Sequence, residues 1–227
     1  MKKSMLRKVL LLACSAVLLV CLSVGATLAY LTSEKTVTNT FTVGKVEIKL
    51  DEAPVDPEGN VIANEERRAS NSYKLMPGHT YTKDPTVTVV ANSEESYVRM
   101  IVTVSDIAAL KEAFPVDKYP TYYSGDVFLL EKLVGDWDSS VWPCASATAA
   151  GVYEFRYNKT VNTLDGKDKT LEALFRSITI PGTVDNDKLN KLQGTSENPF
   201  KITIVAQAIQ ADGFDTAEKA WTAFETK

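Results

Sequence analysis

Few side chains in this sequence could carry out covalent or metal chemistry. The 227 residues include a single His, His79, and three Cys. A structural zinc site needs about four Cys or His ligands, and a catalytic thiol such as Cys144 needs a base such as His to activate it. His79 is the sole candidate for that base, and it lies in the turn-like stretch Pro77-Gly78-His79-Thr80. We therefore expect no catalytic residue, no cofactor and no metal site, and interpret His79 as a surface turn residue.

One acidic stretch resembles the start of a calcium-binding loop. Asp185-Asn186-Asp187 begins like an EF-hand, but Leu189 stands at the third ligand position, where an oxygen ligand is required. Carboxylates are also favoured in the first turn of a helix, where they complement the helix dipole. The stretch therefore predicts an acidic helix N-terminus instead of a calcium site.

Aromatic residues gather in the middle of the chain. Aromatic side chains on loops can stack on sugars or lie in a protein interface, and they also fill cores. Core packing is the favoured interpretation, and Trp137 and Trp142 remain candidates for an interaction surface. The cluster comprises Tyr119, Tyr122, Tyr123, Trp137 and Trp142.

The first 29 residues have the pattern of a secretory signal peptide. An apolar run from Val9 to Val24 follows basic residues, and small residues come next. Thr27 and Ala29 suit the −3 and −1 positions, which predicts cleavage after Ala29 and a mature chain beginning at Tyr30. The apolar run is shorter than the roughly 20 residues that span a bilayer, and a retained N-terminal anchor is the open alternative. The basic residues are Lys2, Lys3, Arg7 and Lys8.

Removal of the signal changes the composition of the chain. The remaining 198 residues hold 21 basic and 29 acidic residues, a net charge of −8, and Cys144 as the single Cys. No intramolecular disulfide is then possible, but a chain of this length can bury a sufficient core without one. The absence of a basic excess gives no indication of nucleic-acid binding.

Two adjoining segments alternate as β-strands do. In residues 36–43 the side chains of Val37, Asn39, Phe41 and Val43 share one face, and Thr residues form the other. Residues 45–50 alternate again, with Val46, Ile48 and Leu50 inward. The apolar row changes from odd to even positions at Gly44, which predicts a bulge or sharp bend there.

The remaining pattern predicts a mainly β protein. Alternation places Val98, Met100, Val102 and Val104 inward, and Arg99 and Thr103 outward. Short helices in the connections and a C-terminal helix favour a jelly-roll-like antiparallel β-sandwich. Strands are expected at 79–90 with a break at Pro85, 97–104, 127–134, 151–157 and 200–208. Helices are expected after a Ser105 cap with Pro115 as the stop, at 169–176, at 185–193, and from Asp215 to the end.

The region around the cleavage site resembles the opening of the TasA/camelysin family of exported Gram-positive proteins. Residues 25–32, Gly-Ala-Thr-Leu-Ala-Tyr-Leu-Thr, lead into 39–48, Asn-Thr-Phe-Thr-Val-Gly-Lys-Val-Glu-Ile. Residues 75–83 are similar to the family's Leu-x-Pro-Gly-Asp turn, with His79 in place of the Asp, and 200–214 is similar to its C-terminal part. The resemblance implies a signal peptide cut by a SipW-type signal peptidase. It also implies one jelly-roll domain over 30–227, with a variable insertion region at 105–195.

The resemblance further implies a secreted structural protein of the biofilm matrix. In such fibres each subunit donates its N-terminal segment, here 30–43, as a strand to the next subunit, and Gly44 would act as the hinge. Partners would be the signal peptidase and further copies or a related fibre protein, with membrane contact only before processing. A non-polymerising cell-surface adhesin or fibre-anchoring accessory protein is the alternative. Some camelysins are described as metalloproteases, but without a zinc motif we expect no such activity here.

Overall fold

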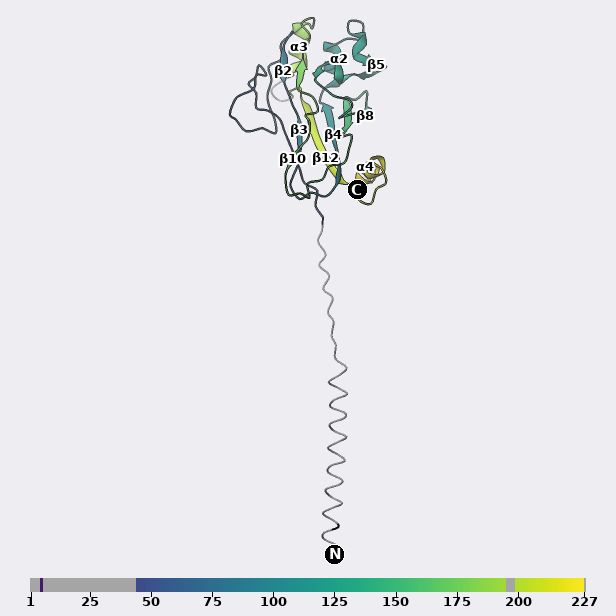
Figure 1. Cartoon of the computed structure of the whole chain (residues 1–227). Coiled ribbons are helices and arrows are strands. Elements are labelled where there is room, and N and C mark those ends of the chain that lie inside the picture. Colours follow the sequence, from purple (N-terminus) through teal and green to yellow (C-terminus); the bar gives the residue numbers. More distant parts are fainter. Residues whose placement is uncertain (1–4, 6–43, 195–198, 227) are drawn as a thin grey trace. The chain divides into compact units, whose positions relative to one another are not determined.

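The computed structural model describes residues 5, 44–194 and 199–226. The chain divides into two units, 1–43 and Gly44–Lys227, and the fold below is that of the second unit by itself (Figure 1). Two sets of predicted residues lie outside the described part of the chain. They are the cleavage-site residues Thr27, Ala29 and Tyr30, and the donor-strand residues Val37, Asn39, Phe41 and Val43.

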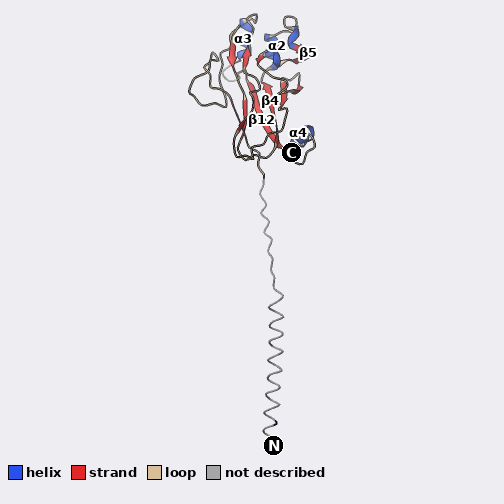
Figure 2. Ribbon diagram, viewed as in Figure 1, coloured by secondary structure: helices blue, strands red, loops and turns tan. Residues whose placement is uncertain are grey.

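The strands form antiparallel sheets (Figure 2). The first has the order β1 (Ile48–Asp51), β3 (Thr86–Val89), β10 (Lys169–Thr170). The second has the order β2 (Thr80–Thr82), β11 (Ser177–Thr179), β7 (Val134–Gly135). The third has the order β12 (Ile202–Gln210), β4 (Ser96–Val104), β9 (Val152–Arg156), β8 (Cys144–Ala147), and β5 (Tyr123–Ser124) pairs with β6 (Val127–Phe128).

The core lies between the sheets and is built by the predicted alternation. Val98, Met100, Val102 and Val104 of β4 are buried against Val87 and Val89 of β3, in a single hydrophobic cluster. β4 pairs with β12 over nine residues, from Ile202 opposite Val104 to Gln210 opposite Ser96. The expected fold class is confirmed: a mainly β, antiparallel sandwich with short helices in its connections and a C-terminal helix.

The middle region 105–195 belongs to this same core. It supplies β5 to β11, and side chains such as Phe114, Phe128 and Leu174 are fully buried in the shared cluster. Its helical elements are α2 (Ile107–Ala113), α3 (Asn186–Gln193) and the 3₁₀ turns η1 (Pro120–Tyr122) and η2 (Leu130–Lys132).

Two helix caps differ from the prediction by one residue. Asp106, and not Ser105, caps α2 by accepting a hydrogen bond from the Ala109 amide. The Ser105 hydroxyl accepts instead from the Lys201 amide, which ties the start of α2 to the residue that precedes β12. α4 (Ala217–Glu225) is capped by Thr216, while Asp215 pairs with Lys219.

Two segments take a different secondary structure from the one expected. Residues 127–134 do not form one strand, because Leu130 and Leu133, three residues apart, are both buried by the turn η2. Residues 169–176 have apolar side chains at helical spacing but contain β10 and no helix. The Leu171 amide donates to the Val87 carbonyl and the Leu174 amide to the Pro85 carbonyl, so this backbone bonds to β3 and its approach instead of to itself.

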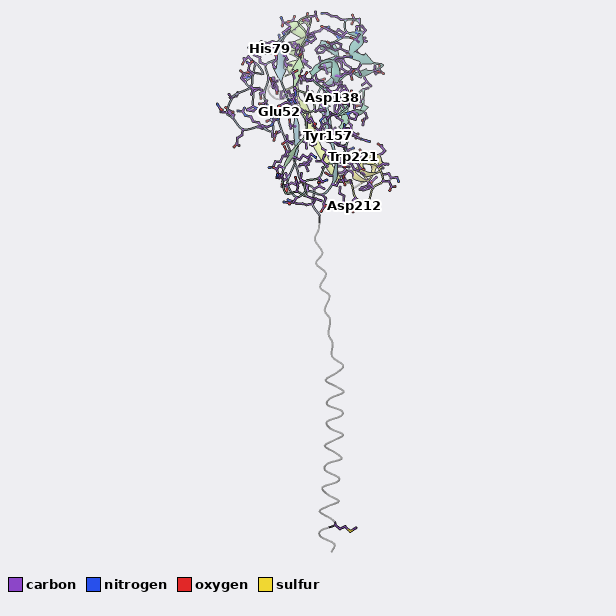
Figure 3. The ribbon with its side chains drawn as sticks, viewed as in Figure 1. Glu52, His79, Asp138, Tyr157, Asp212 and Trp221 are labelled. Carbon is purple, nitrogen blue, oxygen red and sulfur yellow. The ribbon has the colours of Figure 1, made fainter. Side chains whose placement is uncertain are left out.

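Arg99 lies on the outward face of β4, as alternation predicts, but this face is not open to solvent. Its side chain is 4% exposed, since α4 covers this face of the sheet. The guanidinium lies 4.3 Å from the Trp221 ring centroid and pairs with Glu154 at 3.2 Å and Glu225 at 2.9 Å. Trp221 belongs to α4 (Figure 3). Strand alternation identifies the face of a side chain, but a helix docked on the outer face makes that face a second buried layer.

Candidate functional site

β1 and β12 each end a sheet, so each has a hydrogen-bonded strand on one side only among the described residues. An unpaired strand edge presents a row of free backbone N–H and C=O groups. The two edges lie near each other across the sandwich, since β1 and β12 are in contact. On this side both layers end in a strand, and the free edge of β1 stops at Glu52, whose N–H and C=O bond to Arg68.

The apolar side chains of these two strands are incompletely covered. Ile48 and Leu50 of β1 and Ile202 and Ile204 of β12 pack on the core but remain partly exposed. No residue of β12 is fully buried, whereas its neighbour β4 has six buried residues over the same length. Among the described residues, the inward faces of β1 and β12 are thus apolar like those of core strands but only partly covered.

A cavity of about 650 Å³ opens between these strands. Its volume is within the range of about 300–1,000 Å³ typical of ligand sites. Its wall is mainly aliphatic and aromatic, with contributions from the sheets of β1, β2 and β12, from α2 and α3 and from the 69–75 loop. The apolar and aromatic lining includes Leu50, Tyr73, Tyr81, Ile178, Ile202 and Ile204. We call this cavity, together with the two strand edges, the β1–β12 groove.

The groove wall also carries a nearly buried ion pair. Lys83 Nζ lies 2.6 Å from Glu52 Oε2, and the two side chains are 10% and 7% exposed. The Tyr73 ring centroid lies 5.8 Å from the ammonium, and the Tyr73 hydroxyl donates to the Thr82 carbonyl. Burial, with the nearby negative charge of Glu52, raises the pKa of Tyr73, so this phenol is neutral at physiological pH.

The loop that forms the outer wall of the groove is held by Arg67. Its guanidinium pairs with Asp51 and with Asp84 Oδ2, the latter at 2.8 Å. Asp84 Oδ1 in turn accepts from the Ala53 amide at 2.6 Å. These contacts join the 52–72 loop to the ends of β1 and β3, which keeps the groove wall in place. Such a charge network between partly exposed groups contributes more to position than to stability.

No family model, curated protein or solved structure matches this chain. The geometry of the described residues, together with the sequence pattern, is therefore the basis for a functional argument. Within those residues, no helix has the length and hydropathy to cross a membrane. Likewise, no three His, Cys, Asp or Glu side chains in the described ranges are grouped to hold a metal ion.

His79 and Cys144, the two residues considered for catalysis, lie in different elements of the fold. His79 Nε2 contacts the Glu58 carbonyl, and its ring lies 4.7 Å from that of Tyr81, which ties the turn to the 56–60 loop. Cys144 is exposed on the edge strand β8, and desolvation by the surrounding protein, followed by the charge of Glu131, raises the pKa of its thiol. A nucleophilic thiol requires a lowered pKa, so this environment works against a reactive Cys144.

The acidic helix N-terminus is confirmed. The Asp185 carboxylate caps α3 by accepting from the amides of Asp187 and Lys188. Its oxygen is therefore engaged by the helix itself.

Of the two Trp residues proposed as an interaction surface, Trp142 is buried and Trp137 is partly buried. Trp142 is fully buried, and its indole donates to the Glu172 carbonyl at 2.9 Å, so Trp142 cannot contact a partner and that prediction is wrong. Trp137 is partly buried, donates to the Trp142 carbonyl and packs edge-on against Phe155. The segment 137–142 contains a turn that folds both indoles inward, as the core-packing interpretation expected.

Trp142 also forms a cluster with Tyr157 and Glu172 that predicts a pH effect. The Tyr157 hydroxyl donates to Glu172 Oε2 at 2.6 Å, and this bond lowers the pKa of Glu172 below its ordinary 4.5. A carboxyl group whose pKa is lower in the folded than in the unfolded state stabilises the folded protein at pH values above the unfolded pKa. This stabilisation is lost as the pH falls through the folded pKa. We expect Tyr157→Phe to destabilise the protein at pH 7 and to do so less as pH falls below about 4.5.

Urea unfolding of both proteins at a series of pH values measures this difference. In a Glu172→Gln background the residue cannot titrate, so the effect of Tyr157→Phe should be the same at every pH. A pH-dependent difference that persists in that background would assign the effect to another group.

Gly44, the predicted hinge, lies at the first described position of the unit. A Cβ there would lie 2.8 Å from Glu94 Cγ, the movable end of a flexible side chain. The following backbone is fixed, because the Lys45 carbonyl accepts from the Glu94 amide and the Glu47 carbonyl from the Val90 amide. The chain is thus anchored from residue 45 onward, while the predicted bulge involves residues outside the described range.

The β1–β12 groove itself was not predicted from the sequence. Its inward residues, Ile48, Leu50, Ile202 and Ile204, were identified as inward-facing. Alternation gives the face of a strand but not its lateral neighbours. The signal that two such strands are both edges is present only in the sheet order.

Proposed function

We propose that this protein is a secreted subunit of extracellular matrix fibres, in which the β1–β12 groove of one copy receives residues 30–43 of another. The observation that carries the proposal is the coincidence of two unpaired strand edges, β1 and β12, with incompletely covered apolar rows on both sides of an open cavity. The resemblance of the cleavage region and first strand to the TasA/camelysin family supports the same function.

The chemistry of the groove suits an extended strand. An added strand gains main-chain hydrogen bonds from an open edge, and its alternate side chains enter pockets. Residues 36–43 alternate in this way, with Val37, Phe41 and Val43 on one face. At about 3.4 Å per residue such a segment extends about 27 Å, close to the length of the nine-residue strand β12.

A second copy is a better source of the strand than the same chain. The backbone bonds of Lys45 and Glu47 to the 90–94 turn direct the chain along β1 from its first described residues. To enter its own groove, the segment before Gly44 would need a hairpin turn through residues 44–47, whose backbone already bonds to the 90–94 turn. A neighbouring subunit imposes no such constraint.

Donation from one copy to the next is a head-to-tail contact. Such a contact is heterologous and does not close on itself, so it propagates a filament. Cleavage of the signal by a SipW-type signal peptidase would free the donor segment, which until then is tethered to the membrane. The proposed location is therefore extracellular and cell-surface associated, with assembly only after processing.

The proposal predicts that the donor segment is required for assembly. Phe41→Ser in the mature chain from Tyr30 removes the largest apolar group of the donor face, and we expect it to raise the concentration needed for fibre formation at least about tenfold. Negative-stain electron microscopy and sedimentation measure this, with N-terminal sequencing of the secreted protein to fix its first residue. Thr40→Ala, on the other face of the segment, is the matched control and should assemble as the unchanged protein does. A mature chain that stays monomeric under all conditions would refute the proposal.

The same experiment tests the adhesin alternative. An adhesin would remain monomeric and bind a glycan or fibre protein regardless of Phe41. The burial of Trp142 removes one of the two residues named as a possible interaction surface, and the rest of the 119–142 aromatic stretch and a retained anchor remain as its motives.

A further inference from the structure

The Lys83–Glu52 pair is the exceptional feature of the groove wall. It is a nearly buried ion pair in an otherwise largely apolar lining. The cost of desolvating two charges often equals or exceeds their attraction, and replacing such a pair by apolar residues is often neutral or stabilising. The pair is therefore poorly explained by stability alone, and its position in the groove directs attention to what the groove binds.

The pair has hydrogen-bonding capacity to spare. An ammonium has three donors and a carboxylate about four acceptor sites, and the described residues supply one hydrogen bond, from Lys83 Nζ to Glu52 Oε2. The carboxamide of this wall, that of Asn71, is already committed. It donates to the Ala53 carbonyl at 2.8 Å and accepts from the Val55 amide at 3.1 Å.

A carboxamide is the neutral group that matches such a pair. Its oxygen accepts from the ammonium while its NH₂ group donates to the carboxylate. The inward row of the donor segment consists of Val37, Asn39, Phe41 and Val43, so Asn39 is its single polar member. Aliphatic and aromatic partners for the other three are supplied by the remainder of the groove wall.

We infer that Asn39 of the incoming strand docks on the Lys83–Glu52 pair and thereby fixes the register of the donor strand. Asn39 Oδ1 accepts from Lys83 Nζ, and Asn39 Nδ2 donates to Glu52. This inference rests on the proposed function and adds to it the residues that select the donor segment and its alignment.

The pairing excludes the alternative registers. A slip of two residues places Val37 or Phe41 against the ion pair and moves Asn39 among apolar side chains, which leaves buried polar groups without partners. A slip of one residue turns the Thr row inward and the apolar row outward. Each alternative loses contacts that only the Asn39 register makes.

The test uses the mature chain from Tyr30 and reciprocal variants. Asn39→Leu should raise the concentration required for fibre formation about tenfold or more, because it leaves the buried pair without its carboxamide. The double variant Glu52→Leu with Lys83→Met should also assemble poorly, since Asn39 would then enter an apolar wall. Combining all three changes should restore assembly toward that of the unchanged protein, as an apolar residue would again meet an apolar wall.

Controls separate this inference from the function on which it rests. Thermal melts check the fold of each variant, and Val37→Leu is the matched control for a change of size in the same row. If the double variant fails to fold, the register assignment is tested by comparing the concentration that Asn39→Leu needs to form fibres with the concentration that Val37→Leu needs. Normal assembly of Asn39→Leu, or a triple variant no better than Asn39→Leu, overturns the register assignment but leaves the proposed function standing. Failure of the unchanged protein to assemble overturns both.

Discussion

Ile204→Lys is expected to abolish fibre assembly while leaving a folded monomer. Ile204 lies on the free edge strand β12, is partly exposed and lines the cavity. In the empty groove the long lysine side chain can lie along apolar surface and keep its ammonium in water. An incoming strand would bury that charge without a partner, at a cost of several kcal/mol. A loss of about 2.8 kcal/mol in the free energy of association corresponds to a hundredfold change. Sedimentation should therefore show at least a hundredfold rise in the concentration needed to assemble.

The adjacent residue offers a matched control. Val205 is on the same strand but on its opposite face, and it is 46% exposed. Val205→Lys should assemble as the unchanged protein does. Equal loss of assembly in both variants would show that β12 tolerates no charge on either face, which contradicts an inward-facing acceptor groove. Thermal melts of the two monomers should differ little from that of the unchanged protein.

Trp221→Ala should produce the largest loss of stability. Trp221 is 1% exposed, its ring lies over the Arg99 guanidinium, and it contacts Phe224 edge-on. Truncating a buried Trp typically costs about 3–5 kcal/mol. The cation–π contact with Arg99 adds to this, because it is desolvated beneath α4. Arg99 would also lose the cover that makes its ion pair with Glu154 a buried one.

Urea unfolding measures the effect, and Thr222→Ala provides the comparison on the same helix. Thr222 is exposed, and its hydroxyl donates back to the Glu218 carbonyl. Exposed substitutions usually change the free energy of unfolding by less than about 0.5 kcal/mol. A Trp221→Ala loss no larger than that of Thr222→Ala would mean that α4 does not stabilise the sheet beneath it.

The local pattern of the sequence predicted the strands well and their surroundings poorly. β4 and β12 were found by alternation because each has one face in the core. Alternation placed Arg99 on the outward face but did not predict its burial, because alternation does not indicate a helix packed on that face. The helix predicted at 169–176 is absent. Leu171, Leu174 and Phe175 have helical spacing, but this spacing also suits an irregular segment whose amides bond to β3 and to the residue before it.

The candidate site could not be predicted from the sequence, because local patterns do not show which strands become neighbours. The inward residues of β1 and β12 were identified one strand at a time, but a groove is a relation between two edges that come from distant parts of the chain. The ion pair of Glu52 and Lys83 joins a residue assigned to a loop with one assigned to a strand. By contrast, the acidic N-terminus of α3 depends on adjacent residues only, and it was predicted correctly.

The most direct test of the account is to locate the donor segment in assembled fibres. A photo-crosslinking amino acid at position 41 of the mature chain, mixed with isotope-labelled subunits, reports by mass spectrometry which residues it contacts and in which copy. Donation of residues 30–43 to another copy predicts crosslinks from position 41 of one copy to residues of β1, β12 or the cavity wall of another. Crosslinks confined to the same chain, or to a surface away from the β1–β12 groove, would contradict it.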